Sequence, residues 1–200
     1  MSRGRLEAFS DGVIAILITI MVLDLRPPGG SSFHALHPLL PKLLVYILSF
    51  TFLAIYWVNH HHLMQVVERI NGAVLWANMI LLFSLSLVPA VTAWLGEHPL
   101  AAGPVLIYGV VLLLCAISYY ILSLSLLRIH GPTSRLAVAI SRDRKEKLSL
   151  VAYIVALPVA LVLPLASMGL YIAVAITWLV PDRRIERVTG QEIVVPPDTE

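Results

Sequence analysis

The chain has 200 residues, of which 58% are hydrophobic and only 13% are charged, and its formal net charge is +2. Soluble globular domains contain about 45–50% apolar and about 25% charged residues, so this composition excludes a water-soluble globule. Residues 43–67, 70–96, 98–127 and 148–181 contain no Asp, Glu, Lys or Arg. Because a membrane span needs only about 20 apolar residues, these stretches predict a polytopic, all-α membrane protein.

Apolar runs between polar, Pro or Gly breaks predict six transmembrane helices, near residues 5–25, 38–62, 71–95, 103–127, 147–164 and 167–181. The 34 uncharged residues 148–181 are divided into the last two of these helices because they are too long for one span. As one helix they would be about 51 Å long, against a hydrocarbon core of about 30 Å. We therefore expect a short hairpin with its turn at Pro164 to Gly169. Residues 1–187 should form one six-helix domain, followed by a short tail at 188–200.

The basic residues test this topology independently, because cytoplasmic loops of membrane proteins are enriched in Lys and Arg. With the N-terminus inside, twelve of the fourteen basic residues fall in cytoplasmic segments, and only Arg26 and Lys42 fall outside. Both termini are therefore expected in the cytoplasm. Residues 134–147, SRLAVAISRDRKEK, are expected to form an interfacial helix whose basic side faces lipid headgroups.

The first predicted span is unusual because charge lies close to both of its ends. Only twelve uncharged residues separate Asp11 from Asp24, which corresponds to about 18 Å of helix. Carboxylates at membrane depth normally face protein or water, so other helices should surround this one. On a helical wheel of about 100° per residue, one stripe holds Phe9, Gly12, Ile16, Thr19, Ile20 and Leu23. Asp11 lies about 140° from Ile16, on a different face.

This stripe has two interpretations. It can line an axis, in which case Asp11 points outward into the subunit's own bundle. It can also simply pack a core, which is the commoner role of an apolar stripe on a membrane helix.

The second predicted span ends in YWVNHHHLMQ, with histidines at positions 60 to 62. Neighbouring residues of a helix point about 100° apart, so these three side chains cannot ligate one metal ion. The other histidines are expected in loops, which disfavours a bis-histidine haem. We therefore expect no metal and no cofactor. The run should lie level with residues 5–11, so His60 to His62 are candidate partners of Asp11, with the Trp57 N–H as a further donor.

Other polar residues within the spans are expected to serve in helix packing and interhelical hydrogen bonding rather than in substrate binding. They are Ser49, Thr51, Asn78, Ser84, Ser86, Thr92, Ser118 and Ser123. Pro89, Pro158 and Pro164 are expected to kink or end helices.

Arg5-x-x-x-Phe9-Ser10-Asp11, which opens the first span, resembles the signature of the transmembrane protein 175 family. These are potassium channels of endosomes, lysosomes and prokaryotes. Trp57-Val-Asn-His60-His61 is similar to the family's Trp-x-x-His-His element in the second helix. A single six-helix unit resembles the prokaryotic members, which form homotetramers, whereas the animal proteins fuse two units and dimerise. Met64 departs from the family, where an aromatic residue is expected.

The resemblance implies a weakly K⁺-over-Na⁺ selective channel in which the first helix lines the pore and apolar side chains form the constriction. Carried over from the Phe-Ser-Asp motif, the constriction falls on Ile16, Ile20 and Leu23, and a hydroxyl position implicated in selectivity falls on Thr19. The resemblance also implies an interhelical bonding network made of Arg5, Phe9, Ser10, Asp11, Trp57, His60 and His61.

The sequence therefore predicts a homotetrameric potassium channel of a prokaryotic cell membrane. Its expected partners are further copies of the chain, K⁺ ions as the permeant species and the lipid bilayer, with no nucleic acid. No enzyme is expected, because no nucleophile with a base, metal-ligand spacing or glycine-rich phosphate loop is present.

Two alternatives stay open. One is a proton-coupled secondary transporter that uses Asp11 and His60, because ionisable groups at membrane depth often mark such paths. Clustering of these groups at one membrane face fits a structural brace better than a midplane substrate site. The other alternative is a non-conducting membrane scaffold, which would leave the unusual first helix without a purpose.

Overall fold

The computed structural model describes residues 2–131, 134 and 144–179, and this part of the chain contains helices and no strands. Helix α1 (Arg3–Ile20) continues into the 3₁₀ turn η1 (Met21–Asp24), and the 3₁₀ segment η2 (Phe33–Leu39) leads into α2 (Leu40–Gln65). The remaining helices are α3 (Gly72–Ser86), α4 (Val88–Glu97), α5 (Ala102–His130), α7 (Arg144–Val162) and α8 (Pro164–Leu179). The tail at 188–200, and all but the ends of the expected interfacial helix at 134–147, lie outside the described residues.

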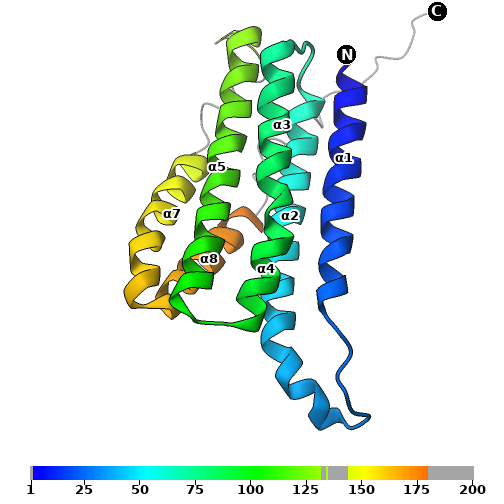
Figure 1. Cartoon of the computed structure of the whole chain (residues 1–200). Helices are drawn as coiled ribbons and strands as arrows, with labels where there is room; N and C mark the ends of the chain where they lie inside the picture. The colour runs from blue at the N-terminus through cyan, green and yellow to red at the C-terminus, as the bar shows by residue number, and fades with distance from the viewer. Residues whose placement is uncertain (1, 132–133, 135–143, 180–200) are drawn as a thin grey trace, which may run out of the picture.

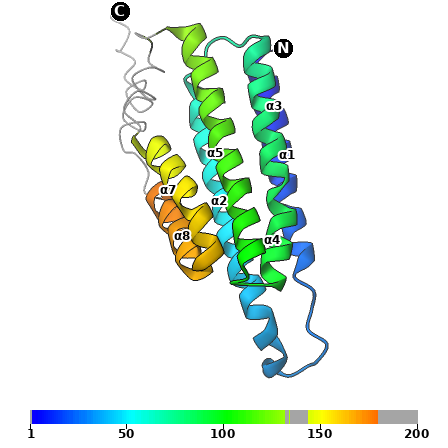
Figure 2. The same ribbon diagram turned by 60° about the vertical axis from the view of Figure 1, so that its left-hand side comes forward.

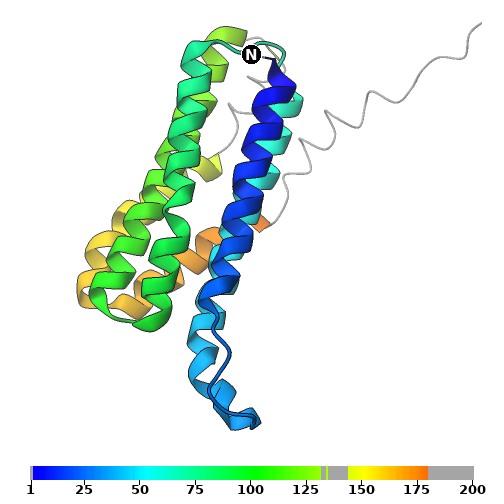
Figure 3. The ribbon, with the colours of Figure 1, turned by 45° about the vertical axis from the view of Figure 1, so that its right-hand side comes forward.

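The helices form an elongated bundle in which α1, α2, α3–α4 and α5 run lengthwise (Figure 1). Helix α1 packs against α2, α3 and α4 and lies on the side of the bundle away from the α7–α8 hairpin (Figures 1 and 3). At the end opposite the N-terminus, η2 and the first turns of α2 project beyond the other helices. Helix α1 is therefore a peripheral element of the single chain.

Four helical segments are long and apolar enough to cross a membrane: Arg3–Asp24, Phe33–Gln65, Gly72–Glu97 and Ala102–His130. Helices α7 and α8 complete the predicted six, but they are shorter. The 16 residues of α8 span about 24 Å, less than the hydrocarbon core of about 30 Å. Figure 2 shows the hairpin beside only part of α5.

Two proline positions place helix boundaries differently from the sequence prediction. The third predicted helix, at 71–95, is divided at Leu87 into α3 and α4, because Pro89 has no N–H to continue the helical hydrogen-bond ladder. The hairpin was expected to turn over Pro164 to Gly169. It turns instead at Leu163, and Pro164 begins α8, where the fixed φ and missing N–H of proline suit the first helical turn.

The interior consists of two apolar clusters. One joins α1, α2, α3 and α5, and the other joins α2, α4 and α5 to the α7–α8 hairpin. At the hairpin contact, the Tyr171 hydroxyl donates to the Val105 carbonyl oxygen (3.2 Å). A Cβ atom on Gly109 would collide with that hydroxyl, so glycine permits the close approach of α8 to α5.

Several of the polar residues expected to bond between helices do so. Ser49 contacts the Tyr108 hydroxyl (2.9 Å) and accepts from Thr92 (2.7 Å). Ser84 and Ser118 join α3 to α5 (2.8 Å). By contrast, the hydroxyls of Thr51 and Ser86 donate to carbonyl oxygens of their own helices.

Candidate functional site

Helix α1, together with the η1 turn that continues it, has one face that is buried within the chain. Its members are Leu6, Ser10, Ile14, Leu17 and Met21, none more than 6% exposed. They recur every three or four residues, which places them on one side of the helix. This face packs into the first apolar cluster, so the rest of the chain covers only one side of α1.

The opposite face of α1 and η1 is uncovered. The exposed stripe consists of Phe9, Gly12, Ile16, Thr19, Ile20 and Leu23. Ile16 is 60% exposed and Leu23 is 74% exposed, although both side chains are apolar. The Thr19 hydroxyl donates to the Ile16 carbonyl oxygen (2.9 Å) of the same helix. Of the two interpretations of the stripe, packing within the chain's own core is therefore wrong.

Three buried polar side chains connect α1 to α2 and α3 at the N-terminal end of the bundle. The Asn78 side-chain N–H donates to Ser10 Oγ (2.9 Å), and Asn78 Oδ1 contacts His60 Nε2 (2.9 Å). Ser10 Oγ also donates to the Leu6 carbonyl oxygen (2.9 Å). Ser10, His60 and Asn78 are all 0% exposed. Their hydrogen bonds therefore hold α1 against α2 and α3 where bulk water does not compete for the polar groups.

Asp11 makes a separate contact. Its Oδ1 accepts a hydrogen bond from the Trp57 indole N–H (3.0 Å), as expected from the sequence. The ring of His61 stacks on Trp57 with centroids 6.0 Å apart, and His61 Nδ1 lies 3.2 Å from a carboxylate oxygen of Glu7. These contacts form a second connection between α1 and α2, beside the buried hydrogen bonds of Ser10, Asn78 and His60.

His60 to His62 were candidate partners of Asp11, but Asp11 bonds to Trp57, whereas His60 contacts Asn78 and His61 contacts Glu7. Trp57 and His61 are four residues apart and share a face of α2, whereas His60 is rotated by about 100° from His61. That rotation turns His60 to Asn78 of α3. Its Nδ1 atom has no hydrogen-bond partner among the described residues.

Arg5 and Phe9 were also implied as network members, and neither is part of the bonded contacts. Arg5 is exposed and makes no hydrogen bond or ion pair within the part of the chain that the structure describes. On the wheel it lies about 20° from Ile16, at one end of the exposed stripe. Phe9 is 48% exposed on the same face.

Three contributing residues were absent from the predicted site. Asn78 was assigned only to general interhelical bonding, Glu7 contacts His61, and Arg3 donates to the carbonyl oxygens of Gln65 and Val67 (3.3 and 3.2 Å). The available signal for Asn78 was a lone amide in the apolar run LWANMILL. Such an amide needs a partner at membrane depth.

Comparisons with known proteins agree with the motifs. Residues 5–89 match the family described as endosomal/lysosomal potassium channel TMEM175. A potassium channel of Chryseobacterium sp. is 49% identical over 187 residues, which cover 94% of this chain and 97% of that relative. A potassium channel of Chamaesiphon minutus is 35% identical over 152 residues, 72% of each chain.

A solved structure supports the same assignment. It is the crystal structure of a lysosomal potassium-selective channel TMEM175 homolog from Chamaesiphon minutus, which matches with a TM-score of 0.74 and 28% sequence identity. The match covers 88% of this chain and 96% of that chain. On the sequence matches and this structural match together, the chain belongs to the TMEM175 family of channels.

Proposed function

We propose that the chain forms a K⁺ channel in which four copies of α1 surround a central axis and their exposed stripes line the pore. One observation carries this proposal: α1 and the η1 turn are covered by their own chain on one face and present Ile16, Ile20 and Leu23 on the other. The named relatives are potassium channels, which supplies the identity of the ion. Closed cyclic symmetry brings the same face of every copy to one axis, so a fourfold arrangement would bury this face in each copy.

The stripe suits an apolar constriction. A cation that passes a ring of Ile16 side chains must shed water while it gains few protein ligands, so the ring can restrict flow by size or by dewetting. K⁺ gives up its hydration water more readily than Na⁺, which produces a weak preference for K⁺. Thr19 donates its proton to the Ile16 carbonyl oxygen, so the hydroxyl lone pairs are available to an ion near that ring.

The polar contacts of α1 fix its rotation about its own axis. Asp11–Trp57 and Ser10–Asn78–His60 engage sides of the helix that face away from the stripe. These groups bond helix to helix and lie toward one end of the bundle. This favours a brace over the relay of a proton-coupled transporter, whose substrate site would lie near the bilayer midplane.

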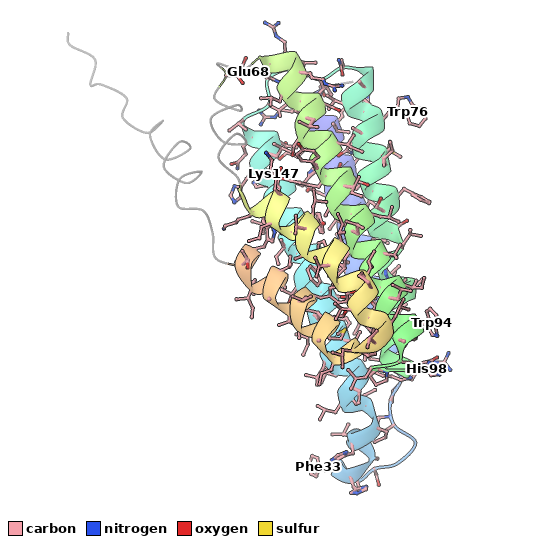
Figure 4. The ribbon with its side chains drawn as sticks, turned by 90° about the vertical axis from the view of Figure 1, so that its left-hand side faces the viewer. Phe33, Glu68, Trp76, Trp94, His98 and Lys147 are labelled. Carbon is pink, nitrogen blue, oxygen red and sulfur yellow. The ribbon has the colours of Figure 1, made fainter. Side chains whose placement is uncertain are left out.

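Two exposed tryptophans support a membrane position for the bundle. Trp76 is 73% exposed and Trp94 is 43% exposed, and Figure 4 shows them on one side of the molecule at two levels. Trp94 follows Trp76 by 18 positions along α3 and α4, which at about 1.5 Å per residue corresponds to about 27 Å, close to the thickness of a hydrocarbon core. Tryptophan is enriched at both membrane interfaces, so we place the two interfaces near these residues.

The same placement orients the chain. Glu68 and Lys147 lie toward the N-terminal end in Figure 4, whereas His98 and Phe33 lie toward the other. Among the described basic residues, Arg3 and Arg5 begin α1, and Arg69 and Arg128 lie at the same end of the bundle, at or beside the last turn of α5. Arg26 and Lys42 lie at the opposite end, near Glu97. This excess of basic residues at the N-terminal end supports cytoplasmic termini in a prokaryotic cell membrane. We also propose that residues 1–187 form one channel domain, because the described helices pack against one another in a single bundle.

Flux from liposomes tests the function. Purified protein in vesicles loaded with K⁺ should release K⁺ down its gradient, and should release Na⁺ more slowly in vesicles loaded with Na⁺, as read by ion-sensitive dyes with protein-free vesicles as control. Release indistinguishable from the protein-free vesicles would favour a non-conducting scaffold. Release that requires an opposing proton gradient would favour the transporter.

A further inference from the structure

A small cavity lies away from the exposed stripe, between α2, α5, α7 and α8. Its volume is about 40 Å³. Its walls include Tyr56, Tyr119, Tyr153 and Trp178, together with Glu146 and Ser149. With Phe52, five aromatic rings and one carboxylate surround this cavity, and they have no part in the proposed pore or in the contacts that brace α1.

Internal contacts hold the walls of this cavity in place. The rings of Tyr56 and Tyr119 meet edge to face with centroids 6.0 Å apart. The Trp178 indole N–H donates to Ser149 Oγ (2.8 Å), and the Tyr119 hydroxyl donates to the Asn59 carbonyl oxygen (3.3 Å). The aromatic rings are therefore oriented before any ligand enters.

The chemistry of the walls favours a cation. Aromatic faces attract ammonium groups, and a nearby carboxylate adds direct charge attraction. Glu146 supplies that carboxylate, and its Oε1 also accepts from Ser123 Oγ (3.3 Å). A contact of this kind is present among the described residues, where Lys145 Nζ lies 6.0 Å from the centroid of the Trp178 ring. Tyr153 is 3% exposed, and its hydroxyl makes no hydrogen bond within the described residues, so it can accept one from a ligand.

The size of the cavity limits which ligands it can hold. One water molecule needs about 10–15 Å³ measured in this way, so about 40 Å³ accommodates roughly three heavy atoms. An ammonium group with one or two carbons fits, whereas a quaternary ammonium group is too large. We propose that this pocket binds the ammonium group of a small primary amine, either free in solution or carried by an ethanolamine lipid headgroup.

The test is a thermal unfolding titration of the full-length protein in detergent with ethylammonium chloride, at constant ionic strength against KCl. A ligand that binds the folded state raises the unfolding temperature in a saturable way. We expect saturation with ethylammonium and little effect of tetramethylammonium. Glu146→Gln should raise the half-saturating concentration by about tenfold or more, because it removes the carboxylate charge. Glu68→Gln removes an exposed carboxylate outside the pocket, so it should leave the half-saturating concentration of ethylammonium unchanged.

Equal stabilisation by KCl, or equal ethylammonium affinity in the wild type and Glu146→Gln, would overturn the proposal. Ala116→Leu provides a second variant that fills the cavity without changing any charge, and it should abolish the response.

Nanodiscs of matched acyl chains distinguish the two sources of the amine. If the unfolding temperature is higher in phosphatidylethanolamine than in phosphatidylglycerol, and Glu146→Gln removes this difference, the site binds the lipid headgroup. No lipid difference, with the ethylammonium response retained, assigns it to a free amine, and failure of both responses removes the site.

Discussion

Ile16→Asn is expected to raise K⁺ flux through the reconstituted channel by about tenfold and to remove its preference for K⁺ over Na⁺. The reason is that an amide oxygen in the constriction gives a dehydrating cation a ligand that the Ile16 side chain cannot offer. A polar contact to a charged group contributes about 1.5–3 kcal/mol, and about 1.4 kcal/mol lowers a barrier enough for a tenfold change. Parallel K⁺ and Na⁺ efflux from liposomes measures both effects.

The matched control for this variant is Ile154→Asn. Ile154 lies on α7, away from α1, and is 56% exposed, close to the 60% of Ile16. Ile154→Asn makes the same change of side chain at a similarly exposed position outside the proposed pore. The flux and ion preference of this variant should therefore equal those of the wild type. Unchanged conductance and selectivity in Ile16→Asn would remove this residue from the proposed constriction.

Asn78→Leu is expected to lower the free energy of unfolding by about 2 kcal/mol, because it leaves two buried polar groups without their partner. Ser10 Oγ loses its donor from Asn78, and His60 Nε2 loses the Asn78 oxygen. Since these contacts hold α1 to α2 and α3, the variant should also loosen α1. Unfolding of the protein in detergent, followed by circular dichroism, measures the change.

A double-mutant cycle separates the network from simple packing. Ser10→Ala in the Asn78→Leu background should cost less than it does alone, because its partner is already gone. Ser86→Ala, on the same helix as Asn78 but bonded only to its own backbone, should change stability little. Additive effects of Ser10→Ala and Asn78→Leu would show that their contact does not stabilise α1.

The separation of the two faces of α1 was predictable from the sequence, because it depends only on helical periodicity. Asp11 and Ile16 differ by about 140° on any α-helix, whatever surrounds it. Three of the four long spans were predictable for a similar reason, because each contains an uncharged run longer than the about 20 residues that a membrane span needs. The first span has only twelve uncharged residues between Asp11 and Asp24, so its uncharged length alone did not identify it. Both predictions rest on properties local to one segment.

The partners of the histidine run were not predictable in the same way. Which of three consecutive histidines faces α1 depends on the rotation of α2, and tertiary packing sets that rotation. Asn78 is 18 residues from His60 and 68 residues from Ser10, so no local pattern links the three side chains. The break at Leu87 was only partly visible, because a proline in a membrane helix can either kink it or end it.

The role of α1 in the pore is tested most directly by thiol modification at Leu23, which is 74% exposed on the stripe. Leu23→Cys would be made together with Cys115→Ser, which removes the one native cysteine. The control is Leu165→Cys in the same background, because Leu165 is 69% exposed at the start of α8. A membrane-impermeant, positively charged thiol reagent should abolish K⁺ flux in the Leu23 variant and label the Leu165 variant without loss of flux. Unchanged K⁺ flux after complete labelling at position 23 would contradict a pore lined by α1.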